Sequence, residues 1–266
     1  MWRFRTRVLI NVTSNCANLG DNLWITPLFK NGVKGSVTFS DTPRTRSIAR
    51  IFDGLADVDF VPLVENVQKS ADETHEAQRI LNCWDRTDVN CIPEIKITKE
   101  EIEGAQAFLS PYKNPIVVIA DNSGSSDPKN YRASVVRPPI PYMQYLCDQA
   151  AKRYTPLQFG LSPNYYGQGI SNFTKLNGTV EIRGLPLRQL AACYHVCGKY
   201  IGGDTGDYHL MLSVGGKAMV SIPHECRGYQ YRRLLYTEEL WKGEPVRVKY
   251  FLHRSNKVAD LLDFTF

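Results

Sequence analysis

The stretch "GKYIGGDTGDYHLMLSVGGKAMVSIP" (residues 198–223) decides the fold. Residues 198–204, "GKYIGGD", place Tyr200 and Ile201 before two glycines and an aspartate, which is typical of a β-strand entering a loop. The following segment predicts a helix that ends at Gly215, and residues 217–223 are again apolar and strand-like. Strand, helix and strand in this order predict a βαβ unit.

The same alternation extends along most of the chain. Helical patterns are expected at residues 23–33, 44–55, 71–84, 98–112, 138–154 and 186–197. Strand patterns are expected at residues 8–12, 35–40 and 58–63, within 114–124, and at 156–162 and 180–184. The pattern breaks near residues 110–115 and then starts again. We therefore expect an α/β protein of two facing Rossmann-like domains with mainly parallel sheets, at residues 1–112 and 113–266.

The composition is that of a globular protein. The 266 residues are 43% hydrophobic and 22% charged, which argues against disorder. No apolar run is long enough to span a bilayer, and the apolar part of residues 1–15 is too short for a secretory signal. Seven cysteines without metal-site spacing are typical of reduced thiols in a cytoplasmic protein. The net charge of +5 favours anionic partners without choosing among them.

The loop at residues 201–210, "IGGDTGDYHL", has the features of a phosphate site. Its glycines let the backbone approach a ligand closely. The helix that follows is expected to begin near Gly206, and the N–H groups of a helix N-terminus bind phosphate readily. The Thr205 hydroxyl and the His209 ring can add hydrogen bonds. The alternative is that Asp204 or Thr205 is an ordinary helix N-cap.

Two further loops after predicted strands carry polar side chains. In "VIADNSGSSDPKNY" (118–131), Ser123 can donate to phosphate oxygens and Lys129 can neutralise their charge. The spacing is not that of a Walker P-loop, so a solvated Lys129 is the alternative. In "NLGDN" (18–22), Asp21 follows the first strand, where a carboxylate can act as general base on a hydroxyl nucleophile or can cap a helix.

Taken together, these segments resemble the family 9 glycosyltransferases, the ADP-heptose:lipopolysaccharide heptosyltransferases. The family's "GD…TP" element after the first strand is matched by "GDNLWITP" (20–27). Its "DTG/DSG-x-x-H" element is matched by "DTGDYHL" (204–210), and its hydroxyl-rich loop ending in lysine and an aromatic residue is matched by "SGSSDPKNY" (123–131). The likeness covers residues 5–30 and 110–223, and the N-terminal half is short for the family.

The resemblance implies a GT-B fold and an inverting, metal-independent transfer of a sugar from a nucleotide-sugar donor to a hydroxyl acceptor, a glycan or lipopolysaccharide. The donor would bind the C-terminal half, its phosphates near Ser123, Lys129, Thr205 and Gly206. Asp204 and His209 would shape the sugar end of the site. Asp21 would be the catalytic base, and acceptors would bind the N-terminal half. No metal and no further cofactor is expected, because lysine, N–H groups and a helix dipole can carry the charge of the leaving diphosphate.

Other functions fit parts of the sequence. Polysaccharide pyruvyl transferases share a GT-B-like form and an "N-x-G-D" entry. A transferase acting on modified bases in DNA is weakly supported by the positive charge. A non-catalytic nucleotide-binding module would not need Asp21. The expected location is the cytoplasm, with peripheral contact to an anionic membrane face as a further expectation.

Overall fold

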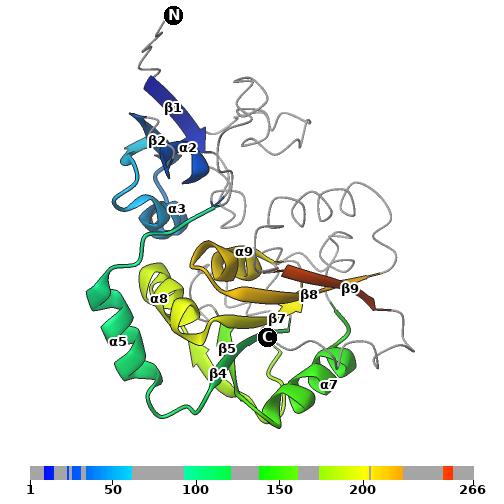
Figure 1. The fold of residues 1–266 in the computed structure, drawn as a ribbon. Helices are drawn as coiled ribbons and strands as arrows, with labels where there is room; N and C mark the ends of the chain where they lie inside the picture. The colour runs from blue at the N-terminus through cyan, green and yellow to red at the C-terminus, as the bar shows by residue number, and fades with distance from the viewer. Residues whose placement is uncertain are drawn as a thin grey trace, which may run out of the picture. The chain divides into compact units, whose positions relative to one another are not determined.

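The computed structural model describes residues 9–14, 23, 26–30, 34–61, 93–120, 138–160, 174–203, 205–223 and 248–253 (Figure 1). The chain divides into two compact units, Met1–Lys96 and Ile97–Phe266, which we call the N-terminal and C-terminal units. The break lies earlier than the position after residue 112 that the sequence pattern indicates. Each unit has its own parallel sheet.

The N-terminal unit contains a three-stranded parallel sheet in the order β1-β2-β3. Its elements are β1 (Leu9–Ser14), α2 (Thr26–Lys30), β2 (Lys34–Ser40), α3 (Pro43–Ala49), η1 (Arg50–Phe52) and β3 (Asp57–Val61). Phe52 is fully buried, and its ring meets those of Phe29 and Phe39 with centroids 5.9 and 6.0 Å away. This aromatic cluster joins the helices to the sheet, because such ring pairs contribute beyond the area they bury.

The C-terminal unit contains a six-stranded sheet in the order β6-β5-β4-β7-β8-β9, and every pairing in it is parallel. Its strands are β4 (Pro115–Ile119), β5 (Thr155–Gly160), β6 (Val180–Arg183), β7 (Lys199–Gly203), β8 (Lys217–Pro223) and β9 (Val248–His253). Its helices are α5 (Lys99–Leu109), α7 (Ile140–Ala151), α8 (Leu187–Cys197) and α9 (Gly206–Ser213). By order along the chain the strands run third, second, first, fourth, fifth, sixth, which is the classic dinucleotide-fold arrangement.

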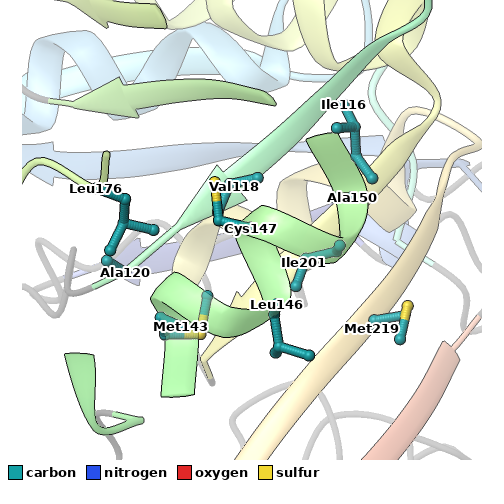
Figure 2. Close-up of a cluster of buried hydrophobic side chains, with 10 residues drawn as sticks. All are labelled: Ile116, Val118, Ala120, Met143, Leu146, Cys147, Ala150, Leu176, Ile201 and Met219. Atoms are coloured by element: carbon teal, nitrogen blue, oxygen red, sulfur yellow. The ribbon is translucent and has the colours of Figure 1, made fainter. Parts of the chain in front are cut away.

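Helix α7 covers one face of this sheet. Its buried side chains Met143, Leu146, Cys147 and Ala150 recur at helical spacing and therefore form one apolar stripe. Figure 2 shows this stripe against buried side chains of the sheet, among them Val118 of β4. Full burial of a methionine or leucine side chain, such as Met143 or Leu146, stabilises a fold by about 1.5–3 kcal/mol. The helices α8 and α9 pack together and contact strands of the sheet.

The N-terminal turn of α5 explains why the break falls after Lys96. Thr98 and Glu101 form a reciprocal capping box that starts this helix, as the sequence predicts. The same Glu101 carboxylate accepts from Arg188 of α8, with Nε–Oε1 at 2.7 Å and Nη2–Oε2 at 2.5 Å. A two-pronged pair with both side chains largely buried ties α5 to the C-terminal unit.

Most of the expected elements are present where they can be compared. The helix ending at Gly215 is confirmed, and that glycine has φ +90°, a left-handed conformation that glycine adopts without steric cost. Strand β9 is not among the sequence expectations, which end with residues 217–223. The helix expected at 71–84 lies outside the described residues.

Candidate functional site

The strand order of the C-terminal unit locates its candidate ligand site. The order reverses between β4 and β7, so the connections that leave these two neighbouring strands diverge to opposite faces of the sheet. Ile119 pairs with Gly202, and the chain leaves both strands just beyond these residues at the same carboxyl edge. Open α/β sheets bind ligands at such a reversal. The two polar loops singled out in the sequence, after β4 and after β7, both start here.

The structure describes three of the seven residues expected at the site. Asp21, Ser123, Lys129 and Asp204 lie outside the described residues. Thr205, Gly206 and His209 are described, and all three lie at or in α9. The start of the loop that carries Ser123 and Lys129 is therefore placed next to the turn that carries Thr205, whereas the side chains of that loop stay predictions.

Thr205 is the N-cap of α9. Its backbone is extended, and its Oγ1 accepts a hydrogen bond from the Asp207 backbone N–H at 3.3 Å. This is the capping alternative that the sequence left open. The Thr205 hydroxyl also donates its own hydrogen to Asp207 Oδ2 at 3.3 Å, so a hydrogen bond from this hydroxyl to a ligand would replace that contact. Gly206 is the first residue of the helix, as expected.

Asp207 also belongs to the candidate site, although it is not among the residues expected there from the sequence. It lies in the first turn of α9 and is half-buried. Its Oδ1 accepts a hydrogen bond from the Tyr194 hydroxyl of α8 at 2.8 Å, and its Oδ2 accepts one from the Thr205 hydroxyl at 3.3 Å. Burial and the nearby Asp207 charge raise the pKa of Tyr194 well above its ordinary value, so this phenol stays protonated and donates.

Tyr200 of β7 reaches the same turn from the sheet. Its side chain is fully buried, and its hydroxyl donates to the Gly203 carbonyl at 3.1 Å. The same oxygen lies 3.3 Å from Thr205 Oγ1. Two buried tyrosines from different elements therefore meet the residues that precede and begin α9.

Gly202 has a packing role that differs from the sequence expectation. The glycines were expected to let a ligand approach, but a Cβ at Gly202 would overlap the Tyr200 phenol and lie 2.8 Å from the Ile119 carbonyl oxygen. Residues two apart on a strand share a face, so Tyr200 folds over the position where a side chain at 202 would be. The space at Gly202 is occupied by the protein itself.

His209 lies in the interior of the C-terminal unit. Its side chain is 2% exposed, and its ring lies against that of Tyr208 with centroids 3.8 Å apart. All residues of α9 from Tyr208 to Ser213 are buried. The expected contact of His209 with the donor stays a prediction.

The buried cysteines of the C-terminal unit have thiols that resist ionisation. Cys193 and Cys197 lie one turn apart on α8, and both are free and buried, as the sequence suggests for small apolar residues of a helix. Burial raises the pKa of Cys193 to about 11 and that of Cys197 to about 12. No group of three or more His, Cys, Asp or Glu side chains among the described residues could hold a metal ion. Within the same residues, no helix has the length and apolarity needed to cross a membrane.

The fold can be compared with solved structures. A family 9 glycosyl transferase from Veillonella parvula has a similar structure, with a TM-score of 0.55 and 15% sequence identity. The match covers 80% of this chain and 81% of the Veillonella chain. The chain has the fold of the family 9 glycosyltransferases. The E. coli heptosyltransferase WaaC, solved with ADP-2-deoxy-2-fluoro heptose, is similar with a TM-score of 0.50 and 10% sequence identity. This match covers 94% of this chain and 95% of the WaaC chain. No protein-family model and no curated protein sequence matches the chain.

The family 9 fold agrees with the expected α/β class and its parallel sheets. What sequence reasoning missed is the support beneath the α9 turn, formed by Tyr194, Tyr200 and Asp207. One signal was available: a tyrosine two residues before a glycine in a buried strand places a large ring beside a position without a side chain. The Tyr194–Asp207 contact had no such signal, because it depends on how α8 packs beside α9.

Proposed function

We propose that the protein is a glycosyltransferase that moves a sugar from a nucleotide-sugar donor to a hydroxyl acceptor. The observation that carries the proposal is the reversal of strand order between β4 and β7, which starts both phosphate-type loops at one edge of the sheet. The likeness in fold to the Veillonella parvula transferase supports it. WaaC was solved with an ADP-heptose analogue, which supports a nucleoside-diphosphate sugar as the donor class.

In this proposal the C-terminal unit binds the donor. The diphosphate lies at the N-terminus of α9, where backbone N–H groups donate to its oxygens and the Thr205 hydroxyl turns from Asp207 to donate to them as well. Ser123 adds a donor and Lys129 adds a positive charge from the loop after β4. Asp204 and His209 shape the turn and the sugar end of the site. These groups stabilise the charge that develops on the leaving diphosphate, which is why we expect activity without a metal ion.

The proposed reaction inverts the anomeric carbon in one displacement. The acceptor oxygen attacks the anomeric carbon while the bond from that carbon to the diphosphate oxygen breaks. The Asp21 carboxylate takes the proton of the acceptor hydroxyl, and the nucleoside diphosphate leaves with the bonding electron pair. The N-terminal unit, which carries Asp21, would bind the acceptor, a glycan or a lipopolysaccharide-type saccharide. We place the protein in the cytoplasm, with acceptor access at the inner membrane face.

Thermal unfolding against a panel of nucleoside diphosphates and nucleotide sugars tests donor binding. A ligand at one hundred times its Kd adds about 2.7 kcal/mol, which raises Tm by roughly 5–10 °C for units of this size. We expect one nucleotide class to give this shift equally with magnesium and with EDTA. Lys129→Ala should reduce it, whereas Lys113→Ala, an exposed lysine just before β4, makes the same charge change at the opposite edge of the sheet and should not. A well-folded protein that no nucleotide shifts would refute the proposal.

Product formation tests the catalytic step separately. Asp21→Asn should bind the donor as the wild type does and lose nearly all transfer, measured as release of nucleoside diphosphate in the presence of acceptor. Asp59→Asn is the matched control, because Asp59 is an exposed carboxylate of the same unit, on β3. Unchanged transfer in Asp21→Asn would remove Asp21 as the base while leaving the donor assignment intact.

A further inference from the structure

Two buried tyrosines from outside α9 meet the turn at which this helix begins. Tyr194 and Tyr200 are both fully buried, and each directs its hydroxyl to the segment between Gly203 and Asp207. Burying a phenol is unfavourable unless its hydroxyl is hydrogen-bonded. Each of these hydroxyls therefore stabilises the fold only while it keeps its partner at the α9 turn. The Tyr194 ring is held from the sheet by Phe159 of β5, edge-on with centroids 5.3 Å apart.

The Tyr194 hydroxyl donates to the Asp207 carboxylate, a negative charge at the N-terminus of α9. A helix N-terminus attracts anions. Asp207 is in the first turn of α9, where the helix dipole favours a carboxylate. The same dipole would favour the donor's diphosphate, so the carboxylate and the diphosphate compete for one positive region. The hydrogen bond from Tyr194 ties the carboxylate to α8, and the contact with Thr205 ties it to the cap.

Tyr200 fixes the other side of the turn. Its hydroxyl binds the Gly203 carbonyl and lies beside Thr205 Oγ1, so one buried atom holds the last residue of β7 and the N-cap of α9 together. The position of that atom is restricted by Gly202, over which the phenol lies. A side chain at 202 would displace the ring, and the hydroxyl would lose both contacts.

We propose that Tyr194 and Tyr200 are positioning residues of the donor site, Tyr194 by restraining the Asp207 carboxylate and Tyr200 by fixing the Gly203–Thr205 turn. This inference rests on the proposed function, because it needs a diphosphate at α9. It predicts that Asp207 opposes binding and that Tyr194 limits this opposition. A site built only for stability would show no such opposition between two hydrogen-bonded neighbours.

The test uses the full chain with ADP and inorganic pyrophosphate as probes, measured by calorimetry. Tyr194→Phe keeps the ring and removes the donor, and we expect both probes to bind about tenfold more weakly. Asp207→Asn keeps an acceptor for Tyr194 and removes the charge, and we expect binding at least as tight as in the wild type. In Tyr194→Phe/Asp207→Asn we expect the lost affinity to return. Tyr200→Phe should weaken both probes by a similar factor, and Asp207→Asn should not restore it.

Tyr154→Phe is the matched control. Tyr154 precedes β5 at the amino edge of the sheet, its ring faces Lys199, and removing its hydroxyl should leave both affinities unchanged. The inference is overturned if Tyr194→Phe and Tyr200→Phe bind both probes as the wild type does. It is also overturned if Asp207→Asn weakens binding or fails to restore Tyr194→Phe, which would mark a purely structural contact. Asp207→Asn keeps the test decisive even if a tyrosine variant does not fold.

The two proposals fail differently. A wild-type protein that binds neither probe and no nucleotide refutes the proposed function, and this inference falls with it. A wild-type protein that binds ADP while the tyrosine and aspartate variants behave like Tyr154→Phe refutes this inference alone.

Discussion

Gly202→Ala tests whether the space above this glycine belongs to the protein interior. The added Cβ would overlap the Tyr200 phenol and lie 2.8 Å from the Ile119 carbonyl oxygen of the neighbouring strand. The phenol can rotate away only by giving up its bonds to Gly203 and Thr205, and the carbonyl belongs to the sheet backbone. Overpacking of this kind costs about 1–3 kcal/mol, and the lost hydrogen bonds add about 1 kcal/mol.

A smaller term acts in the opposite direction. Replacing glycine restricts the unfolded chain and stabilises the folded one by about 0.4–1 kcal/mol. The net expectation for Gly202→Ala is a loss of about 2 kcal/mol, or a fall in Tm of roughly 4–8 °C. Urea and thermal unfolding followed by circular dichroism measure both quantities.

Gly104→Ala is the control for this experiment. Gly104 is in α5, and nothing lies within 4 Å of the Cβ it would acquire. Alanine there should stabilise the protein by about 0.5–1 kcal/mol, because glycine is a poor helix former. If Gly202→Ala were as stable as the wild type, or gained stability as Gly104→Ala does, the packing of Tyr200 over Gly202 would be wrong.

Three further predictions concern the rest of the C-terminal unit. Glu101→Ala should lower the free energy of unfolding in urea by about 2–3 kcal/mol. It removes the side chain that caps α5 and leaves the largely buried Arg188 guanidinium without its carboxylate. Glu101→Gln should lower it by less. Gln158→Leu should cost about 2–3 kcal/mol, since the buried Gln158 amide binds backbone and hydroxyl groups of residues 174–179; a loss below 0.5 kcal/mol in the same assay would contradict this. Cys193 and Cys197 should react with a thiol reagent at pH 8 only after denaturation. Because their folded pKa values exceed the ordinary 9.0, the unfolded thiols lose protons first, and the free energy of unfolding should fall as the pH rises from about 9 to about 12.

Much of the C-terminal unit could be predicted from the sequence because its strands are short apolar runs bounded by proline or glycine. The strand β4 and the pair β7–β8 follow this rule. β9 does not, because "VKYFLH" mixes charged and apolar side chains and pairs with β8 alone among the described strands, so its pattern is that of an edge. The early end of the N-terminal unit was also hidden, since the Glu101–Arg188 pair joins residues far apart in the sequence.

Part of the candidate site could also be predicted from the sequence, and part of it depends on tertiary packing. The capping role of Thr205 follows from local chemistry, and the sequence offered it as an alternative. The support from Tyr194 required knowing which side of α8 meets α9, and that is decided by packing over the whole unit. Local rules therefore identified the turn, whereas its restraint by buried tyrosines came from tertiary structure.

We expect the central place of β4 to slow the folding of the C-terminal unit. β4 is the first strand of this sheet to be synthesised, and β7 is one of its two neighbours. Val117 therefore cannot pair with Tyr200, and the middle of the sheet cannot form, until β7 has been made. Pairing between such distant residues raises contact order, and high contact order slows folding. During synthesis β4 and β5 can pair while one edge of β4 stays open until β7 emerges. An unpaired strand edge is a template for pairing with other chains, so this edge of β4 is the part of the unit that needs protection until β7 is made.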